Sequence, residues 1–323
     1  MEEAQTAAVK EQETDSPVSQ QGQAKQWSCK GPPMPIPGPD DDLSPPTGAG
    51  EQLVRYMQGD VRPAHPSVLH SNSKYLNNPY YREAYATQAL RRYGRDLPVT
   101  YMVPIMQRAL NETTDMKRVL QLFEEEKVKN PEFAEFLVAR RYTVYTKENT
   151  EGYEPGTLGR AIHDFLCIPG MDIEFANRDK GDPKADSDIE YFMRRRGALH
   201  DIEHIVTGFE GSSTAGEQGL GMVHVTVESR YFTPELAQFI SAPNVWITTT
   251  SYNRIALHYH HVLPTILESM QQGIAVGMAI EKPLFMYEWE DYLDWQLDDI
   301  AKELGFMRGP GKEWDWTTEA ARD

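Results

Sequence analysis

Residues 195–217 read RRGALHDIEHIVTGFEGSSTAGE, and the helix that contains this stretch is predicted to organise the fold. Asp186 or Ser187 can cap its start. At 100° per residue the helix has two apolar surfaces. One surface carries Ile189, Met193, His200 and His204, and the other carries Leu199, Ile202 and Val206. A helix that is apolar on two sides is usually central, so we expect both histidines to face inward.

The same stretch predicts a metal site. His200 and His204 lie one helical turn apart, about 6 Å along the axis, which lets two imidazoles reach one divalent ion. Asp201 lies at the edge of that face, and Glu217 follows a Gly-rich turn. Two histidines at this spacing also occur as ordinary surface or core residues. Buried carboxylates need partners, however, and one cation would satisfy all four groups.

Helix signals dominate the rest of the chain after about residue 80. Asn130 with Pro131, and Thr233 with Pro234, have the residue types of helix starts. Residues 222–227 and 245–250 are the best strand candidates, but both also fit helices. We therefore predict an all-α fold. It comprises a Pro-rich disordered or extended arm (1–50), a partly helical extension (51–100), a single helical domain (101–306) and a tail (307–323).

Charge and composition exclude several classes of function. The net charge of −17 argues against nucleic acid or an anionic membrane surface as the main partner, because both would be repelled. Cys29 and Cys167 form no CxxC pair and indicate no thiolate site. No apolar run is long enough to span a bilayer, and the N-terminus has no leader pattern, so we expect a cytoplasmic location.

The sequence contains two further candidate sites. Residues 153–165 (YEPGTLGRAIHDF) form a turn that runs into a helix. Its first N–H groups could face an anion, with Arg160 as a substrate-binding residue, or the segment could be a plain helix start. Farther along, His258 and His261 share a helix face and could bind a second metal, although the nearest carboxylate is Glu268.

Three blocks together resemble the Coq4 family of ubiquinone-biosynthesis proteins. HDIEH at 200–204, followed by TGF and Glu217, is similar to the family's HDxxH…E metal motif. YEPGTLGRAIHDFL at 153–166 is similar to its PxGTLG segment. EKPLFMYEWEDYLDWQLDDIAKELGF at 281–306 resembles its C-terminal block. The blocks occur in the same order as in the family, over roughly residues 100–306.

The resemblance implies that His200, Asp201, His204 and Glu217 hold a metal, usually assigned as zinc. One departure is that Glu217 follows His204 by 13 positions, one more than is usual in that family. The turn at 211–216 can absorb one extra residue, but Glu210 becomes a rival ligand. The resemblance also implies an all-helical fold and a peripheral association with a membrane.

The implied reaction is oxidative removal of the C1 carboxylate of a prenylated aromatic acid, with hydroxylation at that carbon. Zn²⁺ has no redox chemistry, so either the phenol reacts directly with O₂ while the metal holds its oxyanion, or the metal is Fe²⁺. Two histidines and a carboxylate suit either ion. Asp201 and Glu217 are the predicted catalytic carboxylates, and Asp201 is either a fourth ligand or a nearby base.

A prenyl tail needs an apolar slot, because each buried CH₂ contributes about 0.8 kcal/mol. The run from Leu263 through Met278 to Met286 could line that slot, although core packing explains the same residues. We expect the partners to be a prenylated benzoquinone precursor, other ubiquinone-biosynthesis enzymes and a second copy of the chain. Any contact with the inner membrane would use an apolar patch.

Two other functions remain open. The chain could be a non-catalytic carrier that presents prenylated intermediates to partner enzymes, with a structural metal. It could also be an enzyme of the same type recruited to another small-molecule pathway, as a cyclase or lyase. A closed set of four protein ligands would favour the carrier, and an open coordination position would favour an enzyme.

Overall fold

The computed structural model describes residues 73–91, 103–173 and 186–320. The chain divides into two units, Met1–Ser67 and Val68–Asp323, and every described residue belongs to the second. The predicted arm at 1–50 lies outside the described residues. The region predicted as a partly helical extension, 51–100, contributes two described helices, α2 and α3.

The predicted all-α fold is confirmed. Within the described ranges the secondary structure is helical apart from one isolated β-bridge, between Thr157 and Gln296. Both candidate strands lie inside helices. The α-helices are α2 (Lys74–Asn77), α3 (Pro79–Leu90), α4 (Val103–Thr113), α5 (Met116–Lys129), α6 (Pro131–Ala139), α7 (Leu158–Cys167), α8 (Asp188–Thr207), α9 (Thr214–Tyr231), α10 (Pro234–His258), α11 (Leu263–Ala279), α12 (Leu297–Glu303) and α13 (Trp316–Ala320). Short 3₁₀ turns are η4 (Leu284–Met286), η5 (Trp289–Asp291) and η6 (Gly311–Trp314).

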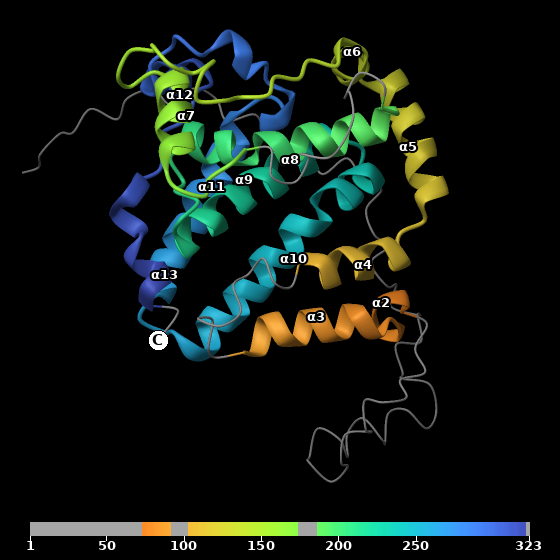
Figure 1. The fold of residues 1–323 in the computed structure, drawn as a ribbon. Coiled ribbons are helices and arrows are strands. Elements are labelled where there is room, and N and C mark those ends of the chain that lie inside the picture. The colour runs from red at the N-terminus through yellow and green to blue at the C-terminus, as the bar shows by residue number, and fades with distance from the viewer. Residues whose placement is uncertain (1–72, 92–102, 174–185, 321–323) are drawn as a thin grey trace, which may run out of the picture. The chain divides into compact units, whose positions relative to one another are not determined.

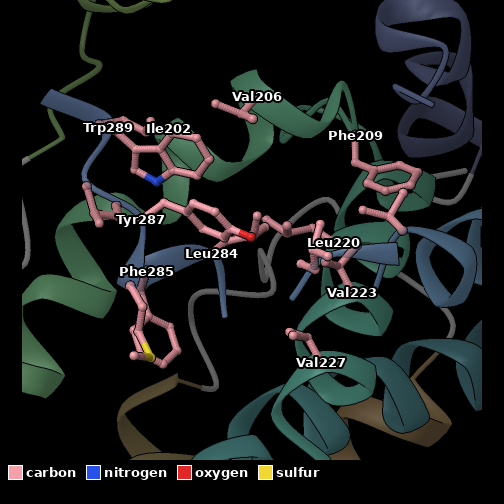
Figure 2. Packing of buried hydrophobic residues seen from close by; sticks show 14 of the residues in the cluster. Ile202, Val206, Phe209, Leu220, Val223, Val227, Leu284, Phe285, Tyr287 and Trp289 are labelled. Carbon is pink, nitrogen blue, oxygen red and sulfur yellow. The ribbon is translucent and has the colours of Figure 1, made fainter. Parts of the chain in front are cut away.

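The predicted central helix is α8, which contacts α6, α7, α9, α12 and η4. Ser187 caps it and forms a reciprocal capping box with Glu190. The fully inward surface is the one that carries Ile202 and Val206, both 0% exposed. Figure 2 shows these two side chains in the apolar cluster. Met193 on the other surface is 39% exposed, so that surface faces inward only toward its C-terminal end, at His204.

Helices α9 and α11 approach each other very closely. A Cβ atom on Gly273 of α11 would lie 2.1 Å from the carbonyl oxygen of Gly219 on α9. Glycine is therefore required there, because any side chain would separate the helices. Leu220, Val223 and Val227 of α9 fill the cluster shown in Figure 2 together with Leu284, Phe285, Tyr287 and Trp289.

A buried arginine joins α8 to the C-terminal block. The guanidinium of Arg195, 1% exposed, donates to the carbonyl oxygens of Phe285 (3.1 Å) and Tyr287 (2.8 Å). It also forms an ion pair with Glu290 at 3.1 Å. These bonds satisfy a charge that would otherwise be costly to bury, and they fix the chain direction of 285–290 against the central helix.

The N-terminal helix α3 packs on α10, and α4 packs on α3 (Figure 1). Residues of all three helices form a small second cluster around Trp246. At the other end of the chain, η6 and α13 contact α9. Residues 307–320, which the sequence assigns to a tail, thus pack on the helical body as far as they are described. No helix among the described residues is long and apolar enough to cross a membrane.

Candidate metal centre

Two helices and the turn between them bring the predicted ligands together. Helix α8 ends at Gly208, whose φ of 73° is left-handed and whose N–H donates to the His204 carbonyl. Ser213 starts α9, and its hydroxyl accepts from the N–H of Gly216 at 2.8 Å. The histidines therefore lie in the second half of α8, and Glu217 lies in the first turn of α9. A carboxylate is favoured there by the helix dipole.

Three side chains converge. The Nε2 atoms of His200 and His204 are 3.2 Å apart. Glu217 Oε2 lies 3.9 Å from His200 Nε2, and Glu217 Oε1 lies 3.7 Å from His204 Nε2. Two nitrogens bound to one tetrahedral ion at about 2.0–2.1 Å would be roughly 3.3 Å apart, so the observed spacing fits a shared cation.

His204 is oriented for binding through Nε2. Its Nδ1 donates to the carbonyl oxygen of Phe209, which leaves the Nε2 lone pair pointing toward His200 and Glu217. Burial lowers the pKa of His204 to about 4, and burial together with the neighbouring His204 also lowers the pKa of His200. Both rings are therefore neutral at pH 7, which is the form that binds a metal.

The position of Glu217 depends on a close backbone crossing. A Cβ atom on Gly216 would lie 2.0 Å from the carbonyl oxygen of Glu210. Only glycine lets the start of α9 pass this close to the turn. Burial raises the pKa of Glu217, whereas His200 and His224 act in the opposite direction only when they are protonated. A cation between the three side chains would stabilise the ionised carboxylate.

Asp201 and Glu210 lie differently from Glu217. Glu217 can share one ion with His200 and His204, whereas neither Asp201 nor Glu210 belongs to such a group within the described part of the chain. Burial, together with the nearby carboxylates of Glu217 and Glu203, raises the pKa of Asp201 to about 6. Asp201 is thus beside the centre, with a pKa suited to exchanging a proton near neutral pH.

The segment around Arg160 is a plain helix start. The N–H groups of Leu158 and Gly159 donate to the carbonyl oxygens of Trp295 (3.0 Å) and Leu293 (2.8 Å). The N–H of Arg160 donates to Thr157 Oγ1 at 3.3 Å. These groups are therefore not available to an anion. The exposed Arg160 side chain pairs with Asp164 at 2.8 Å, and its role in substrate binding stays a prediction.

The remaining predicted residues have other surroundings. Met286 is 3% exposed in the core, whereas Met278 is 39% exposed on α11, so their role in a prenyl slot also stays a prediction. His258 Nε2 contacts the carbonyl oxygen of Leu90 at 2.8 Å. Among the described side chains, the groups close enough to share a metal do not include His258 or His261.

Sequence reasoning missed the C-terminal residues that hold the turn between α8 and α9. Arg308 donates to the carbonyl oxygen of Val206 at 3.1 Å, and Thr317 Oγ1 accepts from the N–H of Ala215 at 3.2 Å. Thr318 Oγ1 accepts from the N–H of Thr214 at 2.7 Å. We call residues 308–318 the C-terminal clamp. Only the hydroxyl-rich WTT at 316–318 hinted at it in the sequence.

The fold and site thus define an all-helical protein with a candidate centre of two histidines and one carboxylate. No protein-family model and no curated protein sequence matches the chain. The chain is similar in structure to a crystal structure described as a "Putative ubiquinone biosynthesis protein" from Nostoc punctiforme PCC 73102. The TM-score is 0.52 and the identity 22%, and the likeness covers 71% of this chain and 98% of the other. At this identity the likeness shows a shared fold.

Proposed function

We propose that this chain is a metal-dependent enzyme of the Coq4 type that acts on a prenylated aromatic acid in ubiquinone biosynthesis. The observation that carries the proposal is the convergence of His200 Nε2, His204 Nε2 and the Glu217 carboxylate. The HDIEH, PGTLG and C-terminal blocks support the same proposal. So does the shared fold with the Nostoc protein, whose description names ubiquinone biosynthesis.

The three side chains would hold Zn²⁺ or Fe²⁺ and leave at least one coordination position for substrate, which favours an enzyme over a carrier. When bound, such an ion would stabilise the negative charge of a phenolate or carboxylate on the substrate. Asp201 lies beside the group, and its raised pKa would let it take up or release a proton during exchange of the C1 carboxylate for a hydroxyl. That exchange is oxidative, and O₂ is the proposed oxidant.

Metal content tests the ligand set. Protein purified without oxygen should contain zinc or iron, and His204→Gln and Glu217→Gln should each contain about one equivalent less per chain than wild type. His260→Gln, which changes an exposed histidine, is the matched control and should keep the metal. A metal content equal to that of wild type in both ligand variants would contradict this centre.

Activity tests the reaction. A prenylated hydroxybenzoate labelled with ¹³C in its carboxyl group should release ¹³CO₂ in the presence of O₂. Asp201→Asn should slow this release by at least about a hundredfold while retaining the metal. Metal binding by wild type with no release of labelled CO₂ would contradict the enzyme and leave the carrier function.

A further inference from the structure

A second group of buried side chains lies next to the candidate centre. Glu203 projects from α8 and His224 from α9, and Glu203 Oε2 is 3.0 Å from His224 Nε2. Each of His200, Glu203 and His224 offers one ligand atom, and these three atoms lie within 4.8 Å of one another. His200 therefore belongs to two groups, one with His204 and Glu217 and the other with Glu203 and His224.

Two members of the second group, Glu203 and His224, are deeply buried and poorly satisfied. Glu203 is 0% exposed and His224 is 2% exposed. Both carboxylate oxygens of Glu203 and the Nδ1 atom of His224 lack a hydrogen bond of acceptable geometry. A buried carboxylate without such bonds is costly, and a native fold seldom keeps one without an ion or other compensation.

The nearest arginine is paired with a different carboxylate. Glu228 Oε1 lies 3.8 Å from His224 Nδ1, but it pairs with the guanidinium of Arg196 at 2.9 Å. In that ion pair the positive charge of Arg196 neutralises the negative charge of Glu228. The carboxylate of Glu203 is left facing a histidine whose other neighbour is also a carboxylate.

We propose that Glu203, His224 and His200 form a second binding position for a divalent cation, deeper in the protein than the position at His204 and Glu217. Two imidazoles and one carboxylate select a borderline transition metal such as Zn²⁺, Fe²⁺ or Mn²⁺ over Mg²⁺ or Ca²⁺. A cation there gives the buried carboxylate of Glu203 a partner. The position does not depend on the proposed reaction. It shares His200 with the proposed catalytic centre, and with both positions filled His200 would bind one cation through each ring nitrogen.

Zinc stoichiometry tests this position. Metal-free full-length chain is loaded with Zn²⁺, freed of loose metal by gel filtration, and analysed for zinc and protein. Glu203→Gln, which preserves shape, should bind one equivalent less than wild type, and Glu217→Gln should also bind one less. The double variant should lose two. Glu126→Gln is the control, since Glu126 is also buried but accepts from Thr233 Oγ1 at 2.7 Å on a different helix.

The outcomes separate the two sites. Full wild-type stoichiometry in Glu203→Gln overturns the second position, whatever happens to Glu217→Gln. A single equivalent that both single variants lose means one cation bound by both carboxylates, and it also overturns the second position. If Glu203→Gln binds less zinc than wild type but Glu217→Gln does not, the result supports the deeper position and contradicts the proposed catalytic ligand set. If Glu203→Gln does not fold, as judged by circular dichroism, His224→Gln replaces it in the same comparison.

Discussion

The carbonyl oxygen of Phe209 accepts a hydrogen bond from Nδ1 of His204, five residues earlier in the chain. This bond fixes which ring nitrogen of His204 carries the proton, so Nε2 can only accept a proton or bind a metal. The turn after α8 is therefore part of the candidate centre, because it determines the chemistry of a histidine on the helix before it.

The first prediction concerns acid. Because the pKa of His204 is about 4 in the folded protein and 6.5 ordinarily, the unfolded chain binds more protons between these values. The contribution of neutral His204 to the free energy of unfolding is present above pH 6.5 and is lost as the pH falls toward 4. Metal-free protein should lose about 1 kcal/mol of unfolding free energy from this group between pH 7 and 5.5. Urea unfolding in the presence of a chelator should show that His204→Gln loses less unfolding free energy between these two pH values than the exposed control His260→Gln. Equal losses would contradict the prediction.

The second prediction concerns Asp201, whose pKa is raised to about 6 from 3.8. The folded protein binds more protons than the unfolded chain between these values, so ionised Asp201 destabilises the fold as the pH rises through this range. Asp201→Asn should stabilise the metal-free protein by about 1–2 kcal/mol at pH 7. The gain should fall to about a third at pH 4.5. Thermal melts at the two pH values provide the check, and a pH-independent gain would exclude this cause.

The third prediction concerns the C-terminal clamp. Thr317→Val removes the hydroxyl that accepts from the N–H of Ala215 and donates to the carbonyl oxygen of Trp314. This loss should lower the free energy of unfolding by about 1–3 kcal/mol. Because Ala215 begins the helix turn that carries Glu217, zinc affinity should also fall roughly tenfold. Thr250→Val is the matched control, since the hydroxyl of Thr250 is equally buried but bonds within α10. Calorimetric titration with Zn²⁺ should give unchanged affinity for the control and reduced affinity for Thr317→Val.

The fourth prediction separates helix propensity from packing. Alanine is a better helix former than glycine by about 1 kcal/mol, so Gly197→Ala at an exposed position within α8 should stabilise the protein. Gly216→Ala is also within a helix, but its Cβ would lie 2.0 Å from a backbone oxygen. It should destabilise the protein by several kcal/mol and abolish zinc binding at Glu217. Stabilisation by both changes, measured by urea unfolding, would contradict the close crossing.

Local signals in the sequence predicted the helices well. Asn130 caps α6, where its side chain accepts from the N–H of Phe133, as its place before Pro131 indicated. Thr233 precedes a helix as predicted, but its hydroxyl bonds to Glu126 on another helix rather than capping its own. Capping by Asn130 depends on neighbours along the chain, whereas the bond of Thr233 depends on packing that sequence spacing does not encode.

The candidate centre was predicted only where its parts are close in sequence. The spacing of His200 and His204 and the turn before Glu217 are local features. The pairing of Glu203 with His224 is not, because it requires the relative rotation of α8 and α9. The helix start at Leu158 likewise depends on residues distant in sequence. Its N–H groups were predicted to be available to an anion, but they donate to backbone carbonyl oxygens of residues 293–295.

The bond between Thr214 and Thr318 joins residues 104 positions apart. At about 5–20 residues per second, a ribosome would take roughly 5–20 s to make the intervening chain. During that interval α8 and the start of α9 exist without the segment that later holds their connecting turn. A nascent chain could therefore display both histidines before Glu217 is held in place, and early exposure to metal could fill a site that is not yet complete.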